Sequence, residues 1–159
     1  MIDTKPILLA TDGSPSAAHA QRKAIELARA LGAPLVVVSV AFLVLPAVGY
    51  TAYGYSSLLA ELTKEEHKRI KELLASVEET AESDGVSCST VGADGLPVEE
   101  ICRKAHDYDA QLVVVGSHGW GPGRRLFSGS VSMGLVHQAP CPVLVVRGQQ
   151  QAHEQAAAA

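Results

Sequence analysis

Glycines and hydroxyl side chains gather in one stretch of the chain that is suited to binding an anion. Gly116 ends an apolar run, Gly119 follows three residues later, and Gly129 stands directly before Ser130. Glycine allows positive φ and a close backbone approach to a ligand, because no Cβ stands in the way. A helix that begins near Ser130 would add unpaired N–H groups and the positive end of its dipole. The stretch is therefore predicted to cradle an anion, and phosphate is the usual anion at such a site.

The glycine spacing differs from that of the common nucleotide-binding loops. Neither G-x-x-x-x-G-K-[ST] nor a G-x-G-x-x-G placed directly between a strand and a helix occurs in the chain. Instead, G-x-x-G is followed by nine residues and then by G-S, which resembles the ATP-binding signature of the universal stress protein family. The resemblance extends to all of GSHGWGPGRRLFSGSVS, to the APCPVLVV that follows, and to the ILLATDGSPSAAHA near the start. It covers the chain from about Pro6 to Val146.

The resemblance implies that an adenine nucleotide is bound by two stretches that are distant in the sequence. Asp12 is expected to accept a hydrogen bond from the ribose or adenine side, or else to belong to the N-cap region of the helix that follows. Val40 and Val115 match apolar positions that line the adenine pocket of the family, and a core role is compatible with that. The residues expected to contact the nucleotide are Ala10, Thr11, Asp12, Val40, Val115, Gly116, His118, Gly119, Arg125, Gly129, Ser130, Val131 and Ser132.

Several features of the glycine loop have a second interpretation. Arg124 and Arg125 could reach a polyphosphate with their guanidinium groups, or could face solvent. His118 could serve acid–base chemistry, but no Ser/His/Asp order, metal-ligand spacing or paired carboxylate accompanies it. The loop itself could be a simple strand-to-helix connection, although such connections need only ~2–6 residues. We therefore assign no catalytic residue and no metal ligand.

Apolar runs alternate with helical patterns along the chain, which predicts a parallel α/β sheet with right-handed crossovers. Val86 to Val91 alternates only weakly and is expected near the sheet edge, and the GADGLP after it indicates a turn. Leu43 to Ser57 lacks periodicity, so we expect a long loop that forms a lid or contact surface, or packs its tyrosines on the next helix. The charged stretch TKEEHKR is interpreted as a solvated helix face. Strands are expected at 7–10, 35–42, 86–91, 112–115 and 143–146, and helices at 15–31, at 58–83, from about 97 and from about 130.

The resemblance also implies the architecture. It is a single open five-stranded parallel sheet, Rossmann-like and similar to the adenine-nucleotide hydrolases, with strand order 3-2-1-4-5 and helices on both faces. In that order the winding reverses between the first and fourth strands, and ligands bind outside the carboxyl ends of the strands at such a point. Thr11 to Gly13 and Gly116 to Ser130 follow these two strands, so they become the two walls of one site.

Length and composition predict one domain with a single core. With 159 residues, 47% of them hydrophobic, the chain is expected to form a domain over residues 1–147 and a flexible tail over 148–159. A net charge of −4 gives no basic surface, so nucleic acid and anionic membranes are not expected partners. Three cysteines, Cys88, Cys102 and Cys141, form no C-x-x-C pair, which argues against a disulfide framework and a thiolate metal site.

The sequence predicts a location in the cytoplasm. No apolar run approaches the ~18 residues that a membrane span needs. The polar Met1 to Lys5 is followed by no signal-peptide stretch, because Thr11 and Asp12 interrupt the first apolar run.

The expected function is that of an ATP-binding regulatory protein of the stress response. The nucleotide would bias a conformation or an interaction with an unknown protein partner, rather than being consumed. AMP or ADP are alternatives to ATP, and Mg²⁺ could accompany the nucleotide. Two rival functions stay open: a slow ATP hydrolase or phosphotransferase of the same fold, with at most weak ATPase activity or autophosphorylation, and a nucleotide-free interaction module.

The protein is expected to form a homodimer through its last strand. The segment from Pro142 to Val146 is apolar and has neither a charge nor a central proline, so an edge strand here would invite pairing. Members of the family commonly dimerise by this strand, and the resemblance therefore implies the same contact.

Overall fold

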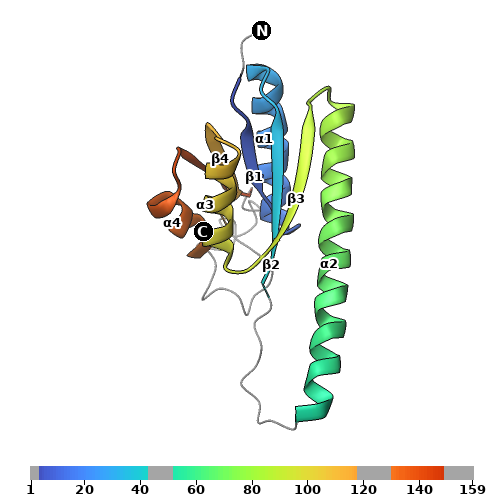
Figure 1. Ribbon diagram of the computed structural model, residues 1–159. Helices are drawn as coiled ribbons and strands as arrows, with labels where there is room; N and C mark the ends of the chain where they lie inside the picture. The colour runs from blue at the N-terminus through green and yellow to red at the C-terminus, as the bar shows by residue number, and fades with distance from the viewer. Residues whose placement is uncertain (1–3, 43–51, 118–129, 149–159) are drawn as a thin grey trace, which may run out of the picture.

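The computed structural model of the protein describes residues 4–42, 52–117 and 130–148 (Figure 1). Strands and helices alternate within these residues. In chain order they are β1 (Ile7–Ala10), α1 (Pro15–Leu31), β2 (Leu35–Ala41), α2 (Ala52–Ser83), β3 (Cys88–Asp94), α3 (Pro97–Asp107), β4 (Leu112–Gly116), α4 (Ser130–Gln138) and β5 (Val143–Val146). All strand pairs are parallel, and the strand order is β3-β2-β1-β4-β5. The predicted fold class and strand order are confirmed.

Helices cover both faces of the sheet and enclose two apolar clusters. On one face α1 and α2 pack against the strands, and on the other face α3 and α4 do so (Figure 1). Strand β1 contributes to both clusters in alternation: Ile7 and Leu9 join the first cluster, whereas Leu8 and Ala10 join the second. This alternation explains why the strand is apolar at every position, since side chains point to opposite faces in turn and both faces are covered.

Helix α1 begins and ends where the sequence predicts. The Ser14 side chain accepts a hydrogen bond from the Ala17 N–H at 3.1 Å, and Pro15 occupies the first helical position. Gly32 closes the helix in the left-handed region with φ of 62°. The inward face consists mainly of alanines, which lets the helix axis lie close to the sheet. Its buried residues are Ala17, Ala20, Ala24, Ile25 and Ala28.

Two element boundaries differ by more than two residues from those expected. Helix α2 begins at Ala52, so the C-terminal part of the expected loop from Leu43 to Ser57 is helical, and residues 43–51 lie outside the described part. Extending an existing helix adds one hydrogen bond for each residue, so the helix continues past the apolar stripe that predicted it. Strand β3 runs from Cys88 to Asp94, so the interpretation of Gly92 as the start of a turn was wrong.

The register of β3 gives the reason for the second difference. Gly92, Ala93 and Asp94 pair with Ser39, Val40 and Ala41 of the neighbouring β2. Pairing with an adjacent strand outweighs the low strand propensity of these residues. Strand β3 forms one edge of the sheet, as expected from its weak alternation. Over the described residues, no helix has a stretch long and apolar enough to cross a bilayer.

Candidate functional site

The carboxyl ends of β1 and β4 lie side by side. Ala10 at the end of β1 pairs with Val115 near the end of β4. After β1 the chain passes to α1 on one face, and α4, which follows β4, lies on the other, so the winding reverses between these strands. Thr11 and Gly116 therefore leave the sheet next to each other, as predicted. In open α/β sheets, such a reversal leaves a crevice beyond the strand ends.

Four residues of the predicted set cannot be placed by the structure. His118, Gly119, Arg125 and Gly129 lie outside the described residues, as does Arg124. The described part of the site consists of the residues around the ends of β1, β2 and β4 and the start of α4.

The first wall is a tight turn between β1 and α1. The Ser14 N–H donates to Asp12 Oδ1 at 2.9 Å, and the Gly13 N–H donates to Thr11 Oγ1 at 3.2 Å. Gly13 has φ of +77°, a conformation that glycine adopts without strain. Thr11 and Ser14 are buried, with exposed fractions of 7% and 0%. Asp12 therefore takes part in the N-cap region of α1, one of its two expected roles, and its role toward ribose or adenine stays a prediction.

Gly116 allows α1 and β4 to touch through their backbones. A Cβ at this position would lie 2.9 Å from the Ser16 carbonyl carbon and 3.0 Å from the Ala17 nitrogen, closer than side chains normally approach backbone. The contact continues at Ser117, whose Oγ lies 3.5 Å from Ser16 Oγ and whose N–H donates to the Val146 carbonyl oxygen at 2.9 Å. The start of α1 is thus held against the end of β4. This packing requires a glycine independently of any ligand.

Three of the predicted apolar residues meet on one face of the sheet. Val115 is buried, and the half-buried Val40 and Val131 pack against the same apolar cluster. Ala10 pairs with Val38, so Val40 extends two residues past the end of β1, beside the turn that follows Ala10. These valines come from β2, β4 and α4, and the fold brings them together.

The second wall includes the start of α4. This helix begins at Ser130, as predicted, with Ser130 exposed and Ser132 buried. Gly134 fixes its position, because a Cβ there would lie 2.7 Å from Val98 Cγ2 of α3. The first turn of a helix has N–H groups without partners inside the helix, which suits it to binding an anion.

Helix α2 supplies a residue that sequence reasoning missed. Arg69 Nη1 donates to the carbonyl oxygen of Asp12 at 3.1 Å. Its Nε and Nη2 donate to the Glu66 carboxylate at 2.9 and 2.7 Å. The hydrogen bond to Glu66 raises the pKa of Arg69, and the charge of Asp12 adds to this effect. Arg69 is exposed, as the interpretation of TKEEHKR as a solvated face predicts, but that interpretation did not include its contact with Asp12. Nothing in the sequence indicates which part of α2 lies beside the turn that follows β1.

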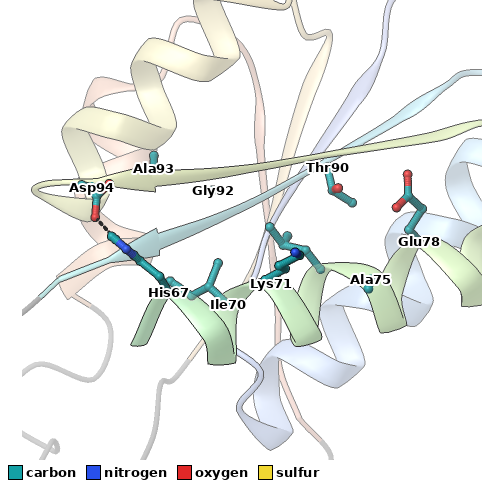
Figure 2. A pocket seen from close by; sticks show the side chains of 10 residues that line it. His67, Ile70, Lys71, Ala75, Glu78, Thr90, Gly92, Ala93 and Asp94 are labelled. Atoms are coloured by element: carbon teal, nitrogen blue, oxygen red, sulfur yellow. Dashed lines mark hydrogen bonds and ion pairs between the residues drawn. The ribbon is translucent and has the colours of Figure 1, made fainter. Parts of the chain in front are cut away.

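A cavity of about 460 Å³ lies between α2 and the edge strand β3. Figure 2 shows His67, Lys71 and Glu78 of the helix along one side and Thr90, Gly92 and Asp94 of the strand along the other. Gly92 leaves room here because it has no side chain. The cavity is lined by His67, Ile70, Lys71, Leu74, Ala75, Glu78, Thr90, Gly92, Ala93 and Asp94. None of the predicted site residues that the structure describes is among them, so this cavity is distinct from the predicted site.

The cysteines behave as packing residues. Burial raises the pKa of Cys88 to about 11 and also raises the pKa of Cys102 and of Cys141. Cys88 packs against the cluster under α1 and α2, and the other two pack against the cluster under α3 and α4. All three are free thiols. Protonated, half-buried thiols are poor nucleophiles and poor metal ligands.

These features define a class of protein, the doubly wound α/β domains, in which the winding of the sheet reverses between two neighbouring strands. A family model described as "universal stress protein family" matches residues 3–147 of the chain. The chain belongs to the universal stress protein family.

Curated relatives agree with this assignment over most of the chain. The universal stress protein MJ0531 of Methanocaldococcus jannaschii is 37% identical over 143 residues, which cover 90% of this chain and 82% of that protein. The universal stress protein YxiE of Bacillus subtilis is 32% identical over 144 residues, which cover 89% and 97%.

Solved structures share the fold. Universal stress protein UspA from Lactobacillus plantarum has a TM-score of 0.76 at 24% identity, covering 92% of this chain and 100% of that one. A universal stress protein in complex with cAMP has a TM-score of 0.68 at 23% identity and covers 92% and 99%. A family member from Arabidopsis thaliana with AMP bound has a TM-score of 0.67 at 20% identity and covers 94% of each chain.

Proposed function

We propose that the protein is a regulator of the stress response that binds an adenine nucleotide, ATP in the first place and AMP or ADP as alternatives. The observation that carries this proposal is the reversal of winding between β1 and β4, because open α/β sheets bind ligands beyond the carboxyl ends of the strands at such a point. One wall is the hydrogen-bonded turn from Thr11 to Ser14, and the fold brings the apolar residues Val40, Val115 and Val131 together beside it. The adenine nucleotides bound by the solved relatives support the same ligand class.

Each part of the site suits one part of the nucleotide. The valines offer an apolar surface to the base, and the Asp12 carboxylate is an acceptor for the ribose hydroxyls or the adenine amino group. The start of α4 at Ser130 and Ser132, together with Gly119, Arg125 and Gly129, would bind the phosphates. His118 and Gly116 complete the contacts in this proposal.

Mg²⁺ would enter with the nucleotide rather than occupy a site of its own. The segment from Gly116 to Val146 has no carboxylate, and the only nearby one in the proposed site is Asp12. Carboxylate and phosphate oxygens are the ligands that Mg²⁺ prefers. The protein therefore offers a single acidic ligand to a metal that the phosphates would chiefly hold.

The nucleotide acts as a bound effector in this proposal. Fast phosphoryl transfer needs an oriented nucleophile, a base and cations that stabilise charge developing on the phosphoryl oxygens. Backbone N–H groups and serine hydroxyls bind ground and transition states alike, which tightens binding without accelerating chemistry. The slow hydrolase or phosphotransferase is the runner-up. A cytoplasmic location, an unidentified protein partner and a domain ending at residue 147 belong to the same proposal.

The decisive experiment identifies the nucleotide and maps it to Asp12. Protein purified without added nucleotide is denatured, the released nucleotide is identified by chromatography, and binding of AMP and of ATP with Mg²⁺ is measured by calorimetry. Asp12→Ala removes the acceptor for the Ser14 N–H, whereas Asp12→Asn keeps an oxygen there and removes only the charge. We expect Asp12→Ala to weaken binding by about tenfold or more, and Asp12→Asn to weaken it less.

Asp109 provides a matched control. It is an exposed carboxylate that precedes β4, at the opposite end of the strands from the proposed site, and it is paired with Lys5. Asp109→Asn should bind nucleotide as the wild type does. If the wild-type protein neither carries nor binds an adenine nucleotide, the proposal is wrong. The function as a nucleotide-free interaction module would then be favoured.

We also propose the homodimer through β5. This strand pairs only with β4 among the described residues, and its four residues are half-buried. Helix α4 packs beside it and exposes Met133 and Val136, at 59% and 54%. A second copy pairing along β5 would cover both the free strand edge and these side chains.

A further inference from the structure

The turn between β1 and α1 is held from outside by helix α2 at two points. Leu73 lies directly under Gly13, where its Cδ atoms are 3.3 Å from the position that a Cβ would take. One turn earlier on the helix, Arg69 donates to the Asp12 carbonyl oxygen at 3.1 Å. The turn therefore has an apolar support and a polar one, both from the same face of α2.

Glu66 fixes the orientation of the Arg69 side chain. Its two carboxylate oxygens accept from Nε and Nη2, at 2.9 and 2.7 Å, which is the two-point geometry that a guanidinium favours. The remaining fork nitrogen, Nη1, is then directed at the Asp12 carbonyl. Glu66 is the more buried partner, with 24% of its side chain exposed against 45% for Arg69.

The positive charge of Arg69 is paired with the Glu66 carboxylate. An arginine near a nucleotide site can either bind a phosphate directly or position a protein group, and this pairing helps to distinguish the two roles. An arginine that binds phosphate presents its guanidinium to the ligand, and its effect grows with the number of phosphates. Arg69 instead uses three of its N–H-bearing nitrogens on protein groups. An effect on nucleotide binding would therefore pass through the backbone at Asp12.

We propose that Arg69, oriented by Glu66, is a positioning residue of the nucleotide site. It holds the Asp12 carbonyl, and with it the turn in which the Asp12 carboxylate and the Ser14 N–H are bonded. This role, which rests on the proposed function, keeps the Asp12 carboxylate in the orientation set by its bond from the Ser14 N–H before the nucleotide arrives. Preorganisation of this kind raises affinity because less order must be created on binding.

The test compares Arg69→Met with Arg103→Met. Arg103 is a closely matched control, because it bonds to Glu100 three residues earlier on α3 and has 52% of its side chain exposed. Its described hydrogen bonds are to Glu100 and Asp107 of the same helix and to no residue of the proposed site. Dissociation constants for AMP and for ATP with Mg²⁺ are measured by calorimetry. Exchange of the Ser14 amide hydrogen is measured by NMR in the nucleotide-free proteins.

We expect Arg69→Met to weaken AMP and ATP by the same factor, about fivefold to tenfold, as loss of one charged hydrogen bond implies. Its Ser14 amide should exchange faster than in the wild type. Arg103→Met should change both readouts by less than about twofold, because its ion pair is exposed and remote. Glu66→Gln keeps the helix intact and serves as the second variant, with a smaller loss of affinity in the same direction for both nucleotides.

Three outcomes would overturn the inference. Unchanged affinity in Arg69→Met and Glu66→Gln would exclude a positioning role. A loss that grows from AMP to ATP would show direct phosphate contact instead. An unchanged Ser14 exchange rate would show that Arg69 does not hold the turn. Failure of the wild type to bind nucleotide would count against the proposed function, and the exchange rate would still decide the role of Arg69 in the turn.

Discussion

Gly116 is the residue at which two requirements coincide. It belongs to the expected nucleotide motif, and it also lets the start of α1 approach the end of β4 at backbone distance. Its expected role in nucleotide binding and its role in packing can be separated by experiment, because the packing role can be measured without ligand. The substitution Gly116→Ala tests the packing role.

Gly116→Ala should destabilise the fold by about 1–3 kcal/mol, the usual cost of forcing an extra carbon into a packed site. The reason is the 2.9 Å approach of the new Cβ to the Ser16 carbonyl carbon, which is backbone and cannot rotate away. Urea denaturation measures the change. Gly92→Ala is the control, since its Cβ would meet only Ile70 Cγ2 at 3.6 Å, and it should be close to neutral. Equal losses in the two variants would contradict this account.

Cys88 leads to a second prediction at the scale of single residues. Burial and the nearby Glu78 and Glu82 raise the pKa of its thiol to about 11. A raised pKa means that the reactive thiolate is scarce below pH 11, so alkylation should be slow at pH 8 and should accelerate as the pH rises toward 11. Labelling with iodoacetamide followed by peptide mass spectrometry measures this rate. Rapid alkylation of Cys88 at pH 8 in the folded protein would show that the thiol is not protected.

Among the helices, α1 has the strongest local signals and the most direct test. Ser14 is fully buried, and its hydroxyl accepts the Ala17 N–H at the first turn. Ser14→Ala should cost about 1 kcal/mol of unfolding free energy, as loss of an N-cap generally does. Ser83→Ala is the control, because Ser83 is exposed at the far end of α2 and caps no N–H. Thermal or urea unfolding measures the loss of unfolding free energy in each variant. Equal losses in the two variants would contradict the role of Ser14 as the N-cap.

Elements were predictable from sequence where the signals are local. The cap at Ser14, the proline after it and the glycine at position 32 placed α1 to within one residue. Strand β3 was misplaced because its bounds follow from pairing with β2, and Gly92 has no local preference for a strand. The start of α2 at Ala52 was missed because no apolar periodicity continues into that segment.

The same distinction holds for the candidate site. The valines and the residues around Asp12 follow from a motif and from strand ends, and the structure brings the described ones together. Arg69 reaches Asp12 across 57 positions of the chain, and this contact depends on how α2 packs on β2 and β3. A single sequence holds no signal for such a contact, because every charged residue on an amphipathic helix looks equally solvated.

At the scale of the whole molecule, the free edge of β5 predicts the oligomeric state. The Pro142 and Val146 carbonyls accept from Val113 and Ser117, so the backbone groups of Val145 point away from β4. Val145→Pro should therefore remove an outward donor, leave the bonds to β4 intact and convert the dimer to a monomer. Sedimentation at micromolar concentration measures the change.

The opposite edge of the sheet supplies the control for that prediction. Strand β3 pairs only with β2 among the described residues, and Thr90 holds the corresponding outward position in it. Thr90→Pro introduces a proline at the corresponding position of the other sheet edge and should leave the dimer intact. A wild-type protein that sediments as a monomer would refute the β5 contact.

Catalytic rate tests the regulatory proposal for the molecule as a whole. Because the proposed site has no carboxylate besides Asp12, ATP turnover with Mg²⁺ should fall far below the ~1–10³ per second typical of enzymes. A coupled phosphate-release assay measures the rate. Steady turnover near ~10 per second, abolished by His118→Ala or Asp12→Ala, would favour the enzyme.

The length of α2 has a mechanical consequence. The helix has 32 residues, and its first contact with the sheet among the bonds described is that of His67 with Asp94 of β3, so the part before Glu66 extends beyond the sheet (Figure 1). At 1.5 Å per residue this overhang is about 21 Å long, and it carries the exposed Leu58 and Leu62. Arg69, which contacts Asp12, lies close to the point where this overhang begins. A tilt of α2 by about 5° at the Asp12 contact would move the far end of the helix by about 2 Å. Such a shift is enough to change the surface that the overhang presents to an apolar partner.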